Sequence, residues 1–208
     1  EIITCTPTFL SMMEYAALWG TDINWVPLNK DLDFDLDEIE KRVSHETRLV
    51  FLCNPNNPTG KLLPADRVVD FCETVSKRAV VFSDEAYYDY ITEPNYPSMV
   101  ELVKKGHDVV VSRTLSKVYG LAGIRVGYLI AKPELAKKLA DRVVANTNIM
   151  AIEAGKAALA DSDFYRFSLQ KNAEAKAMII ATLDELKLPY LESHANFVFF
   201  QAGRDIAE

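Results

Sequence analysis

The sequence has 208 residues, of which 49% are hydrophobic and 25% charged, which is typical of one folded domain or of one domain with part of another. Its net charge of −7, without a run rich in Lys or Arg, argues against nucleic-acid or anionic-membrane partners, because both need concentrated positive charge. The apolar runs are too short to span a bilayer. The three cysteines and three histidines are too scattered for a disulfide framework or a metal site, so we expect core thiols, no metal and, by default, a cytoplasmic location.

Short β-branched runs alternate with amphipathic segments along the chain, which predicts strands and helices in turn. The chain opens inside a predicted strand, EIITC, and the later predicted strands span residues 22–28, 48–54, 79–86, 108–114 and 124–131. The predicted helices span about 8–19, 35–44, 64–77, 98–105, 133–145, 149–160 and 164–186. This order is that of parallel strands linked by crossover helices.

The strand runs LVFLC, AVVF and VVV show no polar alternation, as expected where helices cover both faces of a sheet. The run at 124–131 follows a connection too short for a crossover helix, so we expect it to be antiparallel. The fold class predicted is α/β, a three-layer α/β/α domain with a mostly parallel sheet. We expect a large domain over residues 1–164 and the start of a small α/β domain over 165–208, with a strand in YLESHANFVFFQA.

The ends of the sequence predict a central piece of a longer protein. It starts within a strand and without Met, and QAGRDIAE stops where a capped helix is predicted to begin.

Polar side chains follow the three buried strand runs, at the point where each run ends. Asn54, Asn56 and Asn57 follow the first, Asp84, Glu85 and Tyr87 follow the second, and Ser116 and Lys117 follow the third. In a parallel sheet these ends share one edge, where open α/β sheets bind ligands. Each residue alone also has a plain interpretation as a turn, a helix cap or a surface charge.

Three blocks in this order, NPNNPTG, SDEAYYDY and SRTLSKVYGLAGIRVGY, resemble the aminotransferases of fold type I that depend on pyridoxal phosphate (PLP), and most closely their histidinol-phosphate aminotransferase branch. The resemblance covers essentially the whole chain and implies the PLP-dependent transferase fold. Family members also have a preceding segment with a phosphate-binding turn that contains Gly, and a following segment with an arginine that holds the substrate carboxylate. Neither matches a part of this sequence.

The resemblance implies a role for each matching residue. Lys117 would bind the PLP aldehyde and then move a proton as base and acid, and Asp84 would pair with the pyridine nitrogen. Asn57 and Tyr87 would donate hydrogen bonds to the phenolic oxygen of the ring. With Lys117 and Asp84, Tyr87 completes the catalytic set.

The remaining residues that match the family would bind the phosphate of the cofactor, stack on its ring or lie near the substrate. Arg125, Ser116 and Thr114 would hold the phosphate group. Phe9 would stack on the ring, at a position where many relatives have Tyr. Asn196 would lie near the substrate, although Asn ahead of a strand is commonly a turn residue.

The implied function is a PLP-dependent transaminase. It would move an amino group between an amino acid, histidinol phosphate or an aromatic one, and a 2-oxo acid such as 2-oxoglutarate. A decarboxylase or carbon–sulfur lyase of the same fold remains an alternative, as does a PLP-binding sensor domain of a transcription regulator. A general nucleotide-binding domain is disfavoured because neither GxGxxG nor GK[ST] occurs. The resemblance also implies a homodimer for the longer parent chain.

Overall fold

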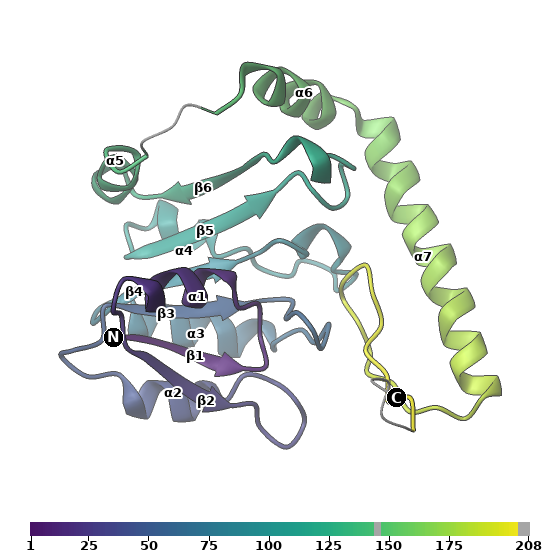
Figure 1. Cartoon of the computed structure of the whole chain (residues 1–208), viewed down its shortest axis with the longest axis horizontal. Coiled ribbons are helices and arrows are strands. Elements are labelled where there is room, and N and C mark those ends of the chain that lie inside the picture. The colour runs from purple at the N-terminus through teal and green to yellow at the C-terminus, as the bar shows by residue number, and fades with distance from the viewer. Residues whose placement is uncertain (144–146, 204–208) are drawn as a thin grey trace.

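Six strands form one mixed sheet in the computed structural model, which describes residues 1–143 and 147–203 (Figure 1). The strands are β1 (Ile2–Thr6), β2 (Ile23–Pro27), β3 (Leu49–Cys53), β4 (Val80–Asp84), β5 (Val109–Thr114) and β6 (Gly127–Ala131), in the spatial order β2-β1-β3-β4-β5-β6. The first five pair in parallel, and β6 is antiparallel to β5. The sheet therefore confirms both the parallel order and the reversed last strand that the sequence predicts.

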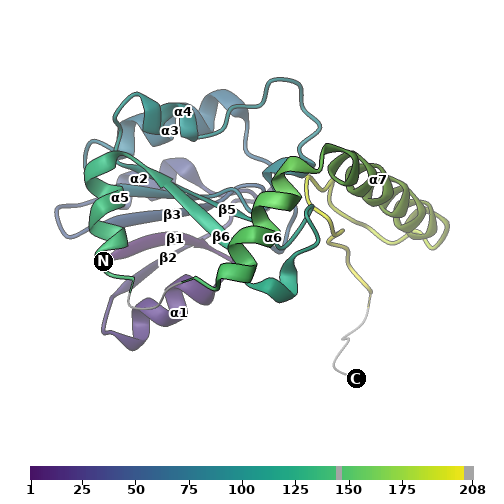
Figure 2. The same cartoon turned by 90° about the horizontal axis from the view of Figure 1, so that it is seen from above.

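Helices cover both faces of the sheet, and the long last helix lies beside it (Figure 1). The helices are α1 (Ser11–Leu18), α2 (Leu36–Arg42), α3 (Ala65–Val75), α4 (Val100–Lys104), α5 (Pro133–Ala140), α6 (Ile149–Ala160) and α7 (Ser162–Glu185), with short 3-10 turns η1 (Tyr88–Tyr90) and η2 (Ala122–Ile124). Figure 2 shows α3 and α4 on one side of the sheet and α1 on the other, and α2 packs against α3. The three-layer α/β/α arrangement is confirmed. None of the helices in the described ranges has the length and apolarity needed to cross a bilayer.

Local capping sets where several helices begin. The side chain of Asp35 accepts a hydrogen bond from the backbone N–H of Glu38 at 2.9 Å and caps α2. Asp161 caps α7 in the same way, through the N–H of Phe164 at 2.8 Å. The predicted boundary between two domains at residue 164 falls inside the first turn of α7, and the division itself stays a prediction.

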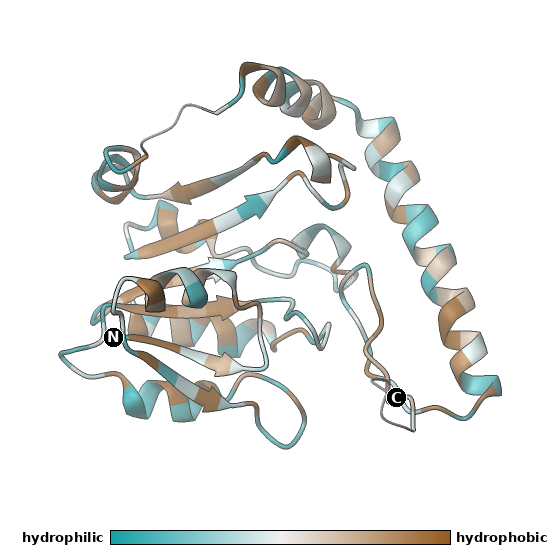
Figure 3. Ribbon diagram, in the orientation of Figure 1, coloured by the Kyte–Doolittle hydropathy of each residue, from teal (hydrophilic) through white to brown (hydrophobic). Residues whose placement is uncertain are grey.

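The core lies around β3, β4 and β5. Val50, Phe51, Leu52 and Cys53 are each at most 1% exposed, so successive residues are buried on both faces of β3. Figure 3 shows β5 hydrophobic over its first part and hydrophilic toward its end. Hydrophobic side chains thus fix the strands, and polar ones appear where the strands leave the core.

The segment after α7 differs from its prediction. Instead of a strand, it has a single antiparallel bridge between Tyr190 and Phe200 within the described residues. The side chain of Ser193 accepts the N–H of Ala195 and donates to the carbonyl of Phe197, and these two hydrogen bonds make a tight turn. A two-stranded ribbon also gains little stability without a third strand. The helix predicted to begin at QAGRDIAE falls largely on residues 204–208, outside the described residues.

Candidate functional site

The carboxyl ends of β3, β4 and β5 open into a cavity of about 400 Å³, named here the rim cavity. Its lining consists of Phe9, Cys53, Asn57, Asp84, Ala86, Tyr87, Ser112, Arg113, Thr114, Ser116, Lys117, Ala122 and Arg125. All eight residues predicted to hold the cofactor are in this set. Asn196, predicted near the substrate, is not. It is exposed in the turn after α7, and its role stays a prediction.

The proline-rich loop after β3 is held by two buried asparagines. Asn54 donates to the phenol oxygen of Tyr96 at 2.7 Å and accepts the N–H of Leu63 at 3.0 Å. The carboxamide oxygen of Asn56 accepts the hydroxyl of Thr8 at 2.9 Å. With their polar groups paired, these amides fix the course of the loop, so the loop is more than a plain turn.

Asn57 extends from this fixed loop to the loop after β4. Its Nδ2 donates to the phenol oxygen of Tyr87 at 3.3 Å. Burial raises the pKa of Tyr87 to about 12, with smaller contributions in the same direction from Cys53 and Asp84, whereas Asn57 lowers it. The phenol therefore stays protonated at neutral pH and keeps an O–H to donate.

Asp84 ends β4 with its carboxylate at the cavity. Its Oδ1 accepts the hydroxyl of Ser112 at 2.8 Å and the N–H of Ala86 at 3.1 Å. Burial raises the pKa of Asp84, while these two hydrogen bonds and the positive charge of Lys117 act to lower it. A carboxylate and an amine thus share one cavity, near enough for their charges to interact.

Lys117 lies in the loop after β5. Its Nζ is 5.2 Å from the centroid of the Tyr87 ring, which places the amine over an aromatic face. The lysine therefore points to the same part of the cavity as the residues that follow β3 and β4.

The lining of the cavity also includes hydroxyls and a guanidinium group. Thr114 ends β5, and its hydroxyl oxygen accepts the N–H of Ser116 at 3.0 Å, which turns the chain. Arg125 follows η2 with a φ of 59°, in the left-handed region, and its Nη1 donates to the carbonyl of Ala122 at 2.8 Å. Two hydroxyls and an exposed cation close together suit an anion.

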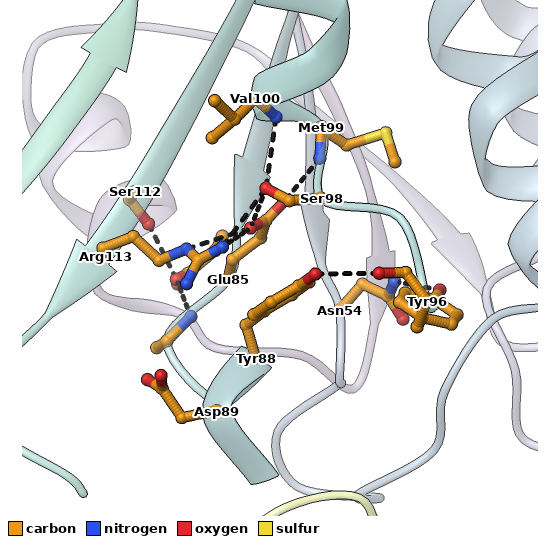
Figure 4. Close-up of polar contacts among 12 residues, drawn as sticks. Asn54, Glu85, Tyr88, Asp89, Tyr96, Ser98, Met99, Val100, Ser112 and Arg113 are labelled. Atoms are coloured by element: carbon orange, nitrogen blue, oxygen red, sulfur yellow. Dashed lines mark hydrogen bonds and ion pairs between the residues drawn. The ribbon is translucent and has the colours of Figure 1, made fainter. Parts of the chain in front are cut away.

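A second polar cluster lies beside the cavity and was not predicted. The buried carboxylate of Glu85 accepts hydrogen bonds from Arg113 Nε at 3.0 Å, from the Ser98 hydroxyl at 2.8 Å and from the N–H of Met99 at 2.8 Å (Figure 4). The Arg113 guanidinium also lies 4.0 Å from the centroid of the Tyr88 ring. Burial raises the pKa of Glu85, and the charge of Arg113 lowers it. This pair joins the ends of β4 and β5.

Five residues of the lining carried no predicted role, namely Cys53, Ala86, Ser112, Arg113 and Ala122. One signal for Ser112 was present in the sequence. It stands two residues before Thr114 on β5, and residues two apart face the same side of a strand.

The turn after α7 also reaches the site. The ring of Phe197 meets that of Tyr87 edge to face, with centroids 5.3 Å apart, and Ala195 is buried in the same cluster. Within the described ranges, no group of three His, Cys, Asp or Glu residues is placed to hold a metal ion.

A family model described as aminotransferase class I and II matches residues 1–208. The chain belongs to this family. The matched range includes every residue that lines the rim cavity.

Two histidinol-phosphate aminotransferases of Bacillus are similar to this chain in sequence. That of Bacillus cytotoxicus is 37% identical over 204 residues, covering 98% of this chain and 55% of the relative. Histidinol-phosphate aminotransferase 2 of Bacillus cereus is 36% identical over 200 residues, covering 96% and 54%. The chain spans about half the length of the curated relatives it matches.

A solved structure shows the same fold. The histidinol-phosphate aminotransferase of Sinorhizobium meliloti, in complex with pyridoxal-5'-phosphate, has a TM-score of 0.89 to this chain at 31% identity, covering 99% of this chain and 56% of that one.

Proposed function

We propose that the chain is the cofactor-binding part of a PLP-dependent transaminase. The parent protein would transfer an amino group between an amino acid, of the histidinol phosphate or aromatic type, and a 2-oxo acid such as 2-oxoglutarate. The observation that carries the proposal is that Lys117 and Asp84 line one cavity together with Asn57, Tyr87 and Arg125.

The residues of the rim cavity fit PLP in their chemistry. The cofactor has an aldehyde, a ring nitrogen, a phenolic oxygen and a phosphate, and the cavity offers an amine, a carboxylate, an amide with a phenol, and a guanidinium with hydroxyls. Phe9, 42% exposed, adds an aromatic face that a ligand ring can cover. Each polar group of the cofactor thus has a complementary partner in the lining.

When bound, PLP supplies a ring that accepts the electron pair left when a bond to the substrate Cα breaks. Lys117 would hold the aldehyde through Nζ, and that amine, once free, can move a proton at the substrate carbon. Asp84 would keep a proton on the ring nitrogen, because a carboxylate next to a ring cation stabilises the charge. Arg125, Thr114 and Ser116 would bind the phosphate.

The proposal includes a homodimer for the full-length parent and a cytoplasmic location. Membership of the aminotransferase family supports the homodimer. The cytoplasmic location is supported by three cysteines that are buried and free of disulfides, as is usual in reducing compartments: Cys5, Cys53 and Cys72.

The test is covalent labelling of the chain with PLP. The wild type, Lys117→Ala and the control Lys41→Ala are mixed with PLP, reduced with borohydride and digested, and the modified peptide is identified by mass spectrometry. Lys41 is a suitable control because its side chain is 73% exposed and it lies on α2, outside the cavity lining. We expect label on Lys117 in the wild type and in Lys41→Ala, and loss of it in Lys117→Ala. Label spread over surface lysines, unchanged in Lys117→Ala, would contradict the site.

The reaction is tested on the full-length parent loaded with PLP. Transamination of histidinol phosphate or an aromatic amino acid consumes 2-oxoglutarate and releases glutamate in equal amounts. Release of carbon dioxide or sulfide instead would assign the protein to the decarboxylases or lyases of the same fold.

A further inference from the structure

Ser112 and Asp84 are joined side chain to side chain across two neighbouring strands. The parallel register places Asp84 of β4 opposite Ser112 of β5, and the Ser112 hydroxyl donates to Asp84 Oδ1 at 2.8 Å. The second hydrogen bond to this carboxylate, from the N–H of Ala86, comes from the local turn and ends on the same oxygen at 3.1 Å. Among the described residues, Ser112 is the one side chain that donates to Asp84.

The two oxygens of the carboxylate are therefore unequal. Oδ1 receives both hydrogen bonds, so the acceptor capacity of Oδ2 remains for a group inside the rim cavity. A carboxylate can rotate about its terminal bond, because such torsions have broad minima. Two donors that bind Oδ1 restrict that rotation before any ligand arrives.

We propose that Ser112 is a positioning residue, which fixes the Asp84 carboxylate through Oδ1 and leaves Oδ2 to meet the ring nitrogen of PLP. The inference rests on the proposed function for the identity of the ligand. The link between the two side chains depends only on their hydrogen bond.

Two substitutions separate the hydroxyl from the shape of the side chain. Ser112→Ala removes the donor. Ser112→Thr keeps it and adds a methyl group, which β5 tolerates because β-branched residues suit strands and because Ser112 borders open cavity space. Circular dichroism of both variants checks that the fold is kept.

The first measurement needs no cofactor. The carbon resonance of the Asp84 carboxyl is followed against pH in the chain without PLP, and assigned by its loss in Asp84→Asn. Because the hydroxyl stabilises the ionised form, Ser112→Ala should raise the pKa of Asp84 further, and Ser112→Thr should return it to the wild-type value. An Asp84 titration unaffected by Ser112→Ala would overturn the proposal.

The second measurement compares binding of PLP with binding of an analogue whose ring nitrogen is replaced by carbon. Ser112→Ala should weaken PLP binding about three- to tenfold, the worth of one hydrogen bond in an ordered site, and leave analogue binding unchanged. On an Asp84→Ala background, Ser112→Ala should weaken PLP binding no further. An equal loss for both ligands would show a merely structural role and would refute positioning.

The two proposals fail in different ways. If the wild-type chain binds no PLP, or binds it at another lysine, the proposed function fails, while the Asp84 titration still decides whether Ser112 governs that carboxylate. If PLP binds at Lys117 but Ser112→Ala changes neither measurement, only the inference about Ser112 fails.

Discussion

Gly60 and Ser193 meet where the loop after β3 touches the turn after α7. A Cβ on Gly60 would lie 2.5 Å from the Ser193 hydroxyl oxygen and 2.8 Å from its Cβ, and the N–H of His194 donates to the Gly60 carbonyl at 2.8 Å. Only glycine allows this approach of two backbones, and the contact connects the turn to the loop that holds Asn57.

Gly60→Ala should therefore lower the free energy of unfolding by about 2 to 4 kcal/mol, the sum of backbone strain at a φ of 73° and overpacking. Gly20→Ala is the matched control, since Gly20 has a φ of 77° and nothing lies within 4 Å of a Cβ placed there. Its loss of stability should therefore come from backbone strain, without overpacking. Denaturant unfolding measures both. On a Ser193→Gly background, which lacks the two clashing side-chain atoms, Gly60→Ala should cost no more than Gly20→Ala. Equal losses at both glycines would mean that the contact does not form.

Tyr87→Phe should weaken PLP binding about three- to tenfold by removing one donor at the phenolic oxygen of the cofactor. Because the pKa of Tyr87 is raised to about 12, the phenol keeps its proton, so the loss should be the same between about pH 7 and pH 9. Fluorescence titration with PLP measures it. Tyr88→Phe is the control, since Tyr88 bonds the carbonyl of Tyr96 outside the cavity. A loss that varies with pH in this range would argue against a neutral phenol.

Asp84→Asn should stabilise the chain at neutral pH. Burial raises the pKa of Asp84 above its ordinary value of 3.8, because the folded chain favours the protonated carboxyl. Protonation therefore contributes its full share to the free energy of unfolding below about pH 3.8, and this share is lost as the pH rises through the folded-state pKa. Asparagine has no such loss and can still accept from Ser112. The difference in free energy of unfolding, measured by urea titration, should therefore grow from pH 4 to pH 7. A variant less stable than the wild type throughout this range would contradict the prediction.

Arg113→Ala should cost about 3 kcal/mol of stability at neutral pH, because it leaves the buried carboxylate of Glu85 without its cation. The loss should be smaller in acid, since without Arg113 the pKa of Glu85 rises further and the protonated form needs no partner. Arg67→Ala is the control. Its ion pair with Asp37 is exposed, at 54% and 70%, and should contribute less than about 1 kcal/mol. Thermal unfolding at two pH values compares them, and similar losses in both variants would show that the buried pair is not stabilising.

Sequence patterns predicted the centre of the sheet well because β3 and the first half of β5 are buried on both faces. A run such as LVFLC has no polar position, and only a covered strand tolerates that. The reversed β6 was predictable because the expected connection, residues 115–123, is too short for a crossover helix. In the structure, only the 3-10 turn η2 lies between Thr114 and Gly127. Helix ends were less accurate. α5 stops at Ala140 although its apolar pattern continues.

The pairing of Ser112 with Asp84, and that of Arg113 with Glu85, could not be predicted in the same way. Both depend on the register between β4 and β5, which single-strand periodicity does not contain. The strand expected near Phe197 was wrong because a strand needs a neighbour, and Ser193 folds the segment into a turn. The residues predicted to hold the cofactor were chosen through their motifs, whose order along the chain resembles a family, and the structure brings all eight to one cavity.

The rim cavity draws on segments that follow four different strands, from Phe9 after β1 to Arg125 beyond β5. A stretch of chain that holds only one of these segments has no site, so a molecule that fits the cavity can recognise only the assembled sheet. Such a molecule shifts the folding equilibrium by mass action, and the melting temperature of the chain should rise with the concentration of free PLP. A chain that holds PLP should then also resist proteolysis longer than the same chain without it.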